Sequence, residues 1–138
     1  MKVLIPVAGA GMRLRPHTYT QPKPLMPVAG KPIIRFIVDK LVEVGLTDFV
    51  FIIGYLGDKI RHYLEQTYPN LEMEFVYQEQ REGSAHAIWM AREILEDEDA
   101  VFIAFGDTIF EANLQTMLEC PYSCLAIKKV NDPREFGV

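Results

Sequence analysis

Residues 9–31 read GAGMRLRPHTYTQPKPLMPVAGK, and this stretch decides how the rest of the chain is interpreted. It directly follows a short apolar run, residues 3–8, that is typical of a buried strand. Its glycines and prolines exclude a long helix. It contains four Lys or Arg residues and no acidic residue. Backbone N–H groups at a glycine-rich turn, together with unpaired cations, hold phosphate groups well, so the stretch predicts a phosphate-binding loop.

Charge is unevenly distributed along the chain. Residues 1–38 contain six Lys or Arg residues and no Asp or Glu, although the whole chain of 138 residues has a formal net charge of −5. Proteins that bind duplex nucleic acid favour a broad basic face, so a small polyphosphate ligand fits this pattern better than nucleic acid does. The alternative is that the six cations are simply solvated.

Length and composition predict a single globular domain over residues 1–138. No apolar run approaches the roughly 20 residues of a membrane helix, so we expect no membrane partner. The amino terminus does not have the pattern of a signal peptide. Cys120 and Cys124 have no second pair of ligands nearby, so free thiols and a cytoplasmic location are expected.

Hydrophobic patterning predicts an α/β protein. Strands are expected over residues 2–8, 48–53, 72–77, 100–105 and 123–128, and helices over residues 32–44, 58–68, 83–95 and 113–119. Gly45 is expected to end the first helix, and Asp58 to cap the second. Apolar strands alternating with amphipathic helices indicate a three-layer αβα fold with a mostly parallel sheet. Ligands bind such sheets at the carboxyl ends of the strands, where Gln78 and Asp107 also stand.

Two common nucleotide-binding motifs do not fit the loop. A dinucleotide fingerprint beginning at Gly9 would need a third glycine where Leu14 stands, and an acidic residue after the second strand, where Gly54 follows. A Walker loop ending at Lys31 would need its first glycine where Leu25 stands. The glycines alone would therefore also be compatible with a simple tight turn.

The combined motifs do identify a family. GAGMRLRPHT followed by QPKPLMPVAGKPII resembles the signature of the sugar-1-phosphate nucleotidylyltransferases, which is roughly GGxGTRLxPxT and then PKxLxPVxxKP. The similarity continues in order through GYLGDKI, QEQREGSAHAI, FGDTIF and VNDPREFGV, and so covers the whole chain. Glucose-1-phosphate thymidylyltransferase and mannose-1-phosphate guanylyltransferase are representative members of this family.

The resemblance implies a function and its partners. The fold would be the Rossmann-like αβα fold of nucleotide-diphospho-sugar transferases. The reaction would transfer a nucleotidyl group from a nucleoside triphosphate to a sugar 1-phosphate, with Mg²⁺ as cofactor. Nucleic acid and membranes would not be partners. Whether the chain forms a homo-oligomer is left open.

The resemblance also assigns roles to individual residues. Catalytic roles fall on Arg13, Lys23 and Asp107, of which Asp107 would bind the metal. Lys23 and Gly137 would contact the sugar phosphate substrate. Nucleotide-binding roles fall on Ala8, Gly9, Ala10, Gly11, Met12, Arg13, Gln78 and Gly83. No histidine receives a catalytic role, although His86 would lie near the base.

Elementary electrostatics supports these roles independently. The oxygen of a sugar 1-phosphate must approach the α-phosphorus of a nucleoside triphosphate, and both groups are anionic. Cations such as Arg13, Lys23 and Mg²⁺ offset this repulsion, while tight positioning aligns the in-line attack. Mg²⁺ prefers oxygen ligands and keeps several waters, so one or two carboxylates suffice.

Three residues depart from the family pattern. Ala10 stands where a second glycine is usual, and would be strained if that position needs a positive φ. Met12 replaces a threonine or serine, and Phe136 replaces a tyrosine.

Family members are considerably longer than this chain. We therefore expect a truncated, amino-terminal nucleotide-binding part that binds nucleotide weakly and needs the missing part for full activity. Two alternatives are a non-catalytic regulatory homologue, which the presence of Arg13, Lys23 and Asp107 disfavours, and a nucleotidyltransferase for another acceptor, such as an alditol phosphate, phosphocholine or a cofactor precursor. The base and the acceptor stay open.

Overall fold

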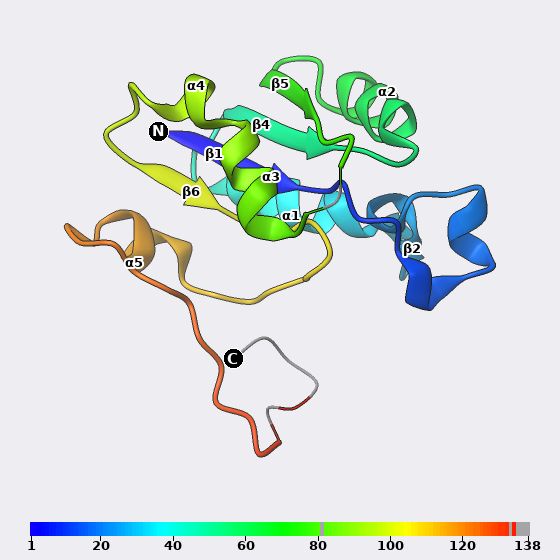
Figure 1. The fold of residues 1–138 in the computed structure, drawn as a ribbon. Coiled ribbons are helices and arrows are strands. Elements are labelled where there is room, and N and C mark those ends of the chain that lie inside the picture. Colours follow the sequence, from blue (N-terminus) through cyan, green and yellow to red (C-terminus); the bar gives the residue numbers. More distant parts are fainter. Residues whose placement is uncertain (81, 133, 135–138) are drawn as a thin grey trace.

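A parallel β-sheet forms the centre of the molecule. The computed structural model describes residues 1–80, 82–132 and 134. In this part of the chain, four parallel strands lie in the order β5–β4–β1–β6 (Figure 1). Their bounds are Lys2–Pro6 for β1, Asp48–Ile53 for β4, Glu72–Tyr77 for β5 and Val101–Ile103 for β6. This arrangement confirms the predicted parallel sheet.

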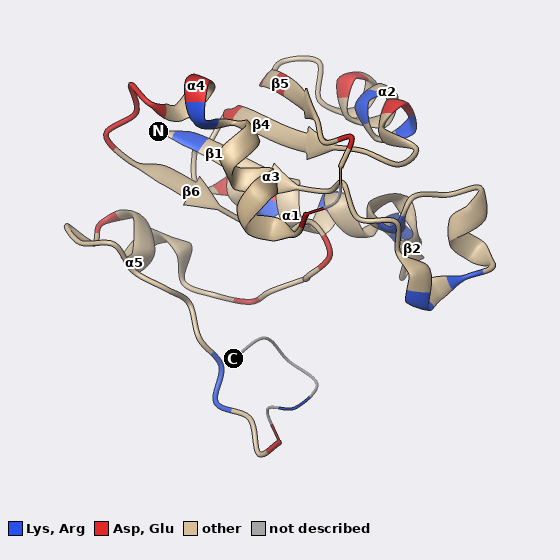
Figure 2. Ribbon diagram, in the orientation of Figure 1, with Lys and Arg blue, Asp and Glu red and all other residues tan. Residues whose placement is uncertain are grey.

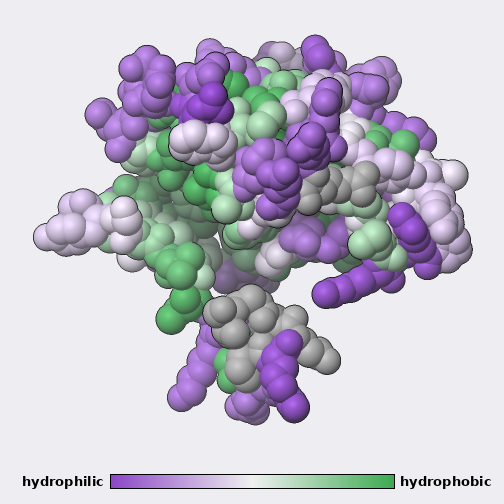
Figure 3. Space-filling view, in the orientation of Figure 1, coloured by the Kyte–Doolittle hydropathy of each residue, from purple (hydrophilic) through white to green (hydrophobic). Residues whose placement is uncertain are grey.

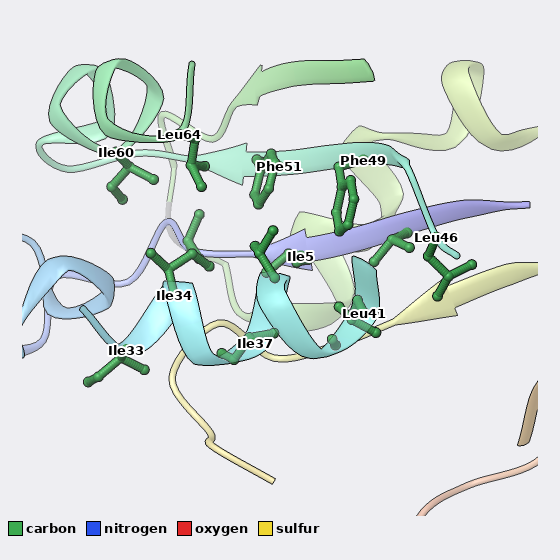
Figure 4. Packing of buried hydrophobic residues seen from close by; sticks show 14 of the residues in the cluster. Ile5, Ile33, Ile34, Ile37, Leu41, Leu46, Phe49, Phe51, Ile60 and Leu64 are labelled. Atoms are coloured by element: carbon green, nitrogen blue, oxygen red, sulfur yellow. The ribbon is translucent and has the colours of Figure 1, made fainter. Parts of the chain in front are cut away.

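Helices cover both faces of the sheet. Their bounds are Ile33–Glu43 for α1, Gly57–Thr67 for α2, Ser84–Met90 for α3, Arg92–Leu95 for α4 and Leu114–Leu118 for α5. Side chains of α1 and α2 pack on one face of β1 and β4, where Ile37 and Ile60 share a cluster with Phe51 (Figure 4). On the opposite face Ala87 of α3 packs against Leu4. The three-layer αβα prediction is therefore confirmed.

The side chains of the two central strands, β1 and β4, point alternately to the two faces of the sheet, and this explains why both faces are buried. Successive strand residues point to opposite faces, so Leu4 joins one cluster while its neighbour Ile5 joins the other. Both side chains are fully buried, as are Phe49 and Phe51, whose rings stack with their centroids 5.8 Å apart. Burying each such side chain stabilises the fold by about 1.5–3 kcal/mol. The central strands therefore hold the sheet rigidly beneath the loops at its carboxyl edge.

Two predicted elements, one strand and one helix, need correction. The strand expected over residues 100–105 is confined to β6, although backbone bonding continues from the Ala104 N–H to the Leu4 carbonyl. The helix expected over residues 83–95 is divided at Ala91, because a turn there brings Ile94 and Leu95 against the apolar cluster beneath α3.

The predicted cap of the second helix is also wrong. Leu56, at φ 56°, precedes α2. Asp58 lies in the first turn and makes no cap hydrogen bond there. Its carboxylate instead accepts a hydrogen bond from the Tyr77 hydroxyl. By contrast Gly45 ends α1 at a positive φ of 86°, as predicted.

The strand expected over residues 123–128 is absent from the described structure. These residues follow α5 away from the body of the molecule (Figure 1). A strand needs a hydrogen-bonded partner, and no strand pairs with this segment in the described part of the chain. Its side chains Leu125 and Ile127 are more than 80% exposed, and Figure 3 shows hydrophobic residues on the surface beside α5. Among the described residues, no helix has the length and apolar character needed to cross a membrane.

Candidate functional site

The loop after β1 is built from single turns rather than extended chain. Residues 7–32, all within the described structure, contain the 3₁₀ turns Met12–Leu14, His17–Tyr19 and Lys23–Leu25. A small antiparallel hairpin follows, with β2 at Pro27–Val28 and β3 at Lys31–Pro32. Prolines and glycines allow such isolated turns but interrupt longer helices. Figure 2 shows basic segments in this loop and acidic ones in the turn after α4.

Gly11 is the residue on which the loop turns back. Its φ is 59°, and a Cβ there would lie 2.9 Å from Cγ2 of Thr18 and 3.1 Å from Cβ of Lys23. A side chain at this position would therefore be both strained and crowded. The hydroxyl of Thr18, which is 1% exposed, donates to the Gly11 carbonyl at 2.9 Å. Sequence reasoning missed this contact, which joins Thr18 to Gly11, and Lys23 lies beside the same glycine.

The strain that was considered for Ala10 is not found. Among the described non-glycine residues, a positive φ occurs at Ala29 and Leu56 but not at Ala10. The left-handed position is taken by Gly11 instead, so the alanine fits without distortion.

Two hydrogen bonds from the region between β4 and the first turn of α2 hold the loop after β1 at Tyr19 and Thr20. The hydroxyl of Tyr55 donates to the carbonyl of Tyr19 at 3.0 Å. The ammonium of Lys59 donates to the carbonyl of Thr20 at 2.7 Å. The GYLGDKI motif therefore supports the loop after β1 from outside.

Gly106 brings Asp107 against the loop. A Cβ at Gly106 would lie only 2.1 Å from Cγ1 of Val7, so only glycine permits this close approach. Asp107, 84 residues away from Lys23 along the chain, then accepts a hydrogen bond at Oδ2 from Nζ of Lys23 at 2.7 Å. Partial burial alone would raise the pKa of the Asp107 carboxyl, but the Lys23 ammonium and the Thr108 hydroxyl hold that pKa below its ordinary value.

These elements border an open cleft of about 500 Å³ at the carboxyl ends of the strands. Nine of the residues predicted from sequence line it: Ala8, Gly9, Gly11, Met12, Arg13, Lys23, Gln78, Gly83 and Asp107. Ala10 is not among the described lining residues, and Gly137 lies outside the described residues. Ser84 and Phe105 also line the cleft. Sequence reasoning missed them, because it expected Ser84 only as a helix residue and Phe105 as part of a buried strand.

Gln78 borders the same cleft and forms a second side-chain pair with His86, which is not among the described lining residues. Gln78, just after β5, is 6% exposed. Its Nε2 lies 3.3 Å from the Gly83 carbonyl oxygen and 3.0 Å from Nδ1 of His86. Sequence reasoning placed His86 near the base site but missed this contact, since eight residues of loop and helix separate the two. His17 is exposed on the second 3₁₀ turn and His62 on α2, and neither is among the described lining residues.

The cleft has the charges to bind a polyanion. In the described part of the chain, Arg13 is exposed and has no carboxylate within ion-pair distance, so its charge is available to a ligand.

The described residues include no group of three or more His, Cys, Asp or Glu that could hold a metal. Asp107 supplies a single carboxylate, which suits a Mg²⁺ held mainly by phosphate oxygens and water rather than by a protein cage.

Comparisons with known proteins agree with the motifs. A family model described as nucleotidyl transferase matches residues 2–138. The bifunctional protein GlmU of Methanocaldococcus jannaschii is 37% identical over 138 residues, which is 100% of this chain and 32% of that protein. UTP–glucose-1-phosphate uridylyltransferase AglF of Haloferax volcanii is 35% identical over 114 residues, which is 83% of this chain and 46% of that protein.

The fold also matches a solved structure. A Bacillus anthracis protein described as a glucose-1-phosphate thymidylyltransferase, crystallised with a sucrose, superposes with a TM-score of 0.76 and 28% identity. The match covers 86% of this chain and 49% of that one. The chain therefore spans between one third and one half of the length of the relatives described here.

Proposed function

Because the chain belongs to the nucleotidyl transferase family, we propose that it forms the amino-terminal, nucleotide-binding part of a sugar-1-phosphate nucleotidyltransferase. The reaction joins an oxygen of a sugar 1-phosphate to the α-phosphorus of a nucleoside triphosphate. The bond between the α-phosphorus and the oxygen that bridges it to the β-phosphate breaks, and pyrophosphate leaves. The products are a nucleoside diphosphate sugar and pyrophosphate.

One observation carries the proposal. Arg13, Lys23 and Asp107, which come from two distant parts of the sequence, line one cleft at the carboxyl ends of parallel strands. Ligands of open α/β sheets bind at this edge. Transfer between two phosphorylated substrates needs cations to offset their charge and a carboxylate to hold their metal. It needs no protein nucleophile.

The residues divide the work by charge and position. Backbone N–H groups at Gly9 and Gly11, together with the exposed guanidinium of Arg13, bind the triphosphate. Lys23 binds the reacting phosphate and the incoming sugar phosphate, offsetting the repulsion between them. Asp107 would hold Mg²⁺, which as a Lewis acid stabilises the charge that develops on the phosphate oxygens.

The first test follows the phosphates themselves. Adding the chain to UTP or dTTP with Mg²⁺ should shift and broaden the three phosphorus resonances in the ³¹P NMR spectrum. Arg13→Ala should remove most of this change. Lys31→Ala is the matched control, because Lys31 is in the same loop but is exposed, packs over the Phe36 ring and is not among the described lining residues.

Transfer is tested by pyrophosphate release. Mixed with a nucleoside triphosphate, Mg²⁺ and a panel of sugar 1-phosphates, the chain should release pyrophosphate slowly, because it lacks the part that full activity needs, and only when both substrates are present. Lys23→Ala should abolish this release. A nucleotide that binds well yet gives no pyrophosphate with any sugar 1-phosphate would contradict transfer by this chain.

A further inference from the structure

Lys59 is a cation at a place where a helix does not favour one. It is exposed in the first turn of α2, which begins at Gly57, and the positive end of the helix dipole disfavours a positive charge there. Within the described part of the chain, no carboxylate lies within ion-pair distance of its ammonium, whereas Arg61 of the same helix pairs with Glu65. The stability of α2 therefore does not account for this lysine.

The ammonium of Lys59 is instead directed to the loop after β1. It donates to the carbonyl of Thr20 at 2.7 Å, and a charged donor makes this a stronger hydrogen bond than a neutral one would. The hydroxyl of Tyr55, just before α2, donates to the neighbouring carbonyl of Tyr19 at 3.0 Å. Two consecutive carbonyl groups of the loop are thus held from one short segment.

The loop needs an external contact of this kind, because its own backbone hydrogen bonds are local. The N–H of Leu14 donates to the carbonyl of Gly11, and the N–H of Met26 donates to the carbonyl of Lys23. Each of these bonds spans three residues and closes a single turn. Such bonds shape the turns but do not fix where the turns lie relative to the sheet.

A short, stiff stretch connects the held carbonyl to the cleft. Only Gln21 and Pro22 separate Thr20 from Lys23. The ring of Pro22 restricts its φ, which is −67° here, so this stretch has little freedom to absorb a movement of Thr20. The position of Thr20 therefore sets that of Lys23, whose Nζ lies 2.7 Å from Oδ2 of Asp107.

We propose that Lys59 is a positioning residue, whose hydrogen bond to the Thr20 carbonyl holds Lys23 in its place in the cleft before the phosphates of a nucleotide bind. This inference rests on the proposed function, which assigns the reacting phosphate to Lys23. Lys59 is not among the described residues that line the cleft, so it acts through the backbone of the loop and not by touching the ligand. A displaced cation would offset phosphate charge less well.

The first experiment needs no ligand. Nuclear Overhauser contacts between the side chains of Lys23 and Asp107 report whether the lysine is in place. Lys59→Met keeps a long unbranched side chain but removes the ammonium, and should lose most of these contacts. Lys59→Arg keeps a charged donor and should retain them. Arg61→Met, which removes the same charge from the same helix, should retain them as well. Unchanged contacts in Lys59→Met overturn the inference.

The second experiment is a double-mutant cycle, in which calorimetry measures the dissociation constant of UTP with Mg²⁺. Lys59→Met should weaken binding about three- to tenfold, the factor that one hydrogen bond contributes. In a chain that already has Lys23→Ala, the same substitution should weaken binding by less than about twofold, because residues that act through one another are not additive. Lys59→Arg should restore the affinity, and circular dichroism checks that every variant is folded.

The outcomes separate this inference from the proposed function. Equal losses from Lys59→Met with and without Lys23 would show that Lys59 attracts the ligand by charge alone, and would overturn the inference while the proposed function stands. A folded, unaltered chain that binds none of UTP, dTTP, GTP, CTP and ATP contradicts the proposed function. The contacts between Lys23 and Asp107 then decide by themselves whether Lys59 positions the lysine.

Discussion

Two side-chain pairs near the carboxyl ends of the strands are held by different forces, and the cleft is lined by both members of one pair and by Gln78 of the other. The Lys23–Asp107 pair is ionic and partly exposed, with 31% of the lysine side chain and 50% of the aspartate side chain accessible. The Gln78–His86 pair joins an amide to an imidazole through a contact of 3.0 Å, and its glutamine is almost completely buried. Water screens the first pair, so a phosphate or a metal can exchange for either partner at little cost. The second pair keeps its geometry, because breaking it would leave a buried donor unsatisfied.

The comparison suggests a division of labour. The ionic pair can reorganise because water screens it, whereas the buried Gln78–His86 contact is fixed before any ligand binds. The predictions below test how the ionic pair and the loop around it are held, and Lys23→Ala comes first because its expected effect is largest.

Replacing Lys23 by alanine should weaken nucleoside triphosphate binding about 10- to 100-fold. A hydrogen bond to a charged group contributes about 1.5–3 kcal/mol, and no other side chain in the described part of the cleft shares the position between Gly11 and Asp107. Calorimetric titration with Mg²⁺–nucleotide measures the effect. Lys31→Ala provides the control, and equal losses in both variants would show that only the overall charge matters.

Replacing Gly106 by alanine should lower the free energy of unfolding by about 1–3 kcal/mol, because the new Cβ would overlap Cγ1 of Val7. Asp107 should move with the backbone, so nucleotide binding should weaken as well. Chemical denaturation measures the change in stability. At Gly9 a Cβ would meet nothing within 4 Å, so Gly9→Ala should leave stability within about 0.5 kcal/mol of the unaltered chain. Similar losses in both variants would contradict the close approach at Gly106.

Thr18→Val tests whether the loop is held in place before ligand binds. The substitution keeps the shape but removes the hydroxyl that donates to the Gly11 carbonyl, which also accepts from the Leu14 N–H. Stability should fall by about 0.5–1.5 kcal/mol. Thr20, an exposed neighbour, supplies the control Thr20→Val, which should change little. An unchanged melting temperature in Thr18→Val would mean that the hydroxyl does not hold the loop.

Asp107→Asn should have the smallest effect on the ligand-free chain, no more than about 1 kcal/mol, because exposed ion pairs contribute little. The pKa of the Asp107 carboxyl is held below its ordinary value. Its stabilising contribution is therefore present above pH of about 4 and is lost as the pH falls further. Melting temperatures of the chain and the variant should differ slightly at pH 6 and converge toward pH 3. A difference that grows in acid would contradict the assigned partner.

Sequence reasoning predicted the elements better than the contacts between them. After their first residues, Lys2 and Asp48, the runs that became β1 and β4 are apolar, and this pattern predicted buried strands. Residues 123–128 show the limit of the same argument, since a strand needs a partner that the sequence pattern does not reveal. The family motifs pointed to Lys23 and Asp107, but not to their direct contact.

The contact between Gln78 and His86 was beyond sequence reasoning for a different reason. It depends on the turn before α3, where Gly83 adopts a φ of 95° and directs its carbonyl toward the amide. Neither the glycine nor the histidine alone indicates that geometry. The sequence likewise could not show whether Ala10 is strained. That depends on which loop residue adopts a positive φ, and in the structure this residue is Gly11.

The most direct test of the central claim, that this cleft binds nucleotide, is a thermal-shift titration of the chain with UTP, dTTP, GTP, CTP and ATP, each with and without Mg²⁺. A ligand at 100 times its dissociation constant stabilises the folded state by about 2.7 kcal/mol. The account predicts a higher melting temperature with at least one nucleotide, enhanced by Mg²⁺ and lost in Arg13→Ala. No shift with any of the five, from a chain shown by circular dichroism to be folded, would contradict it.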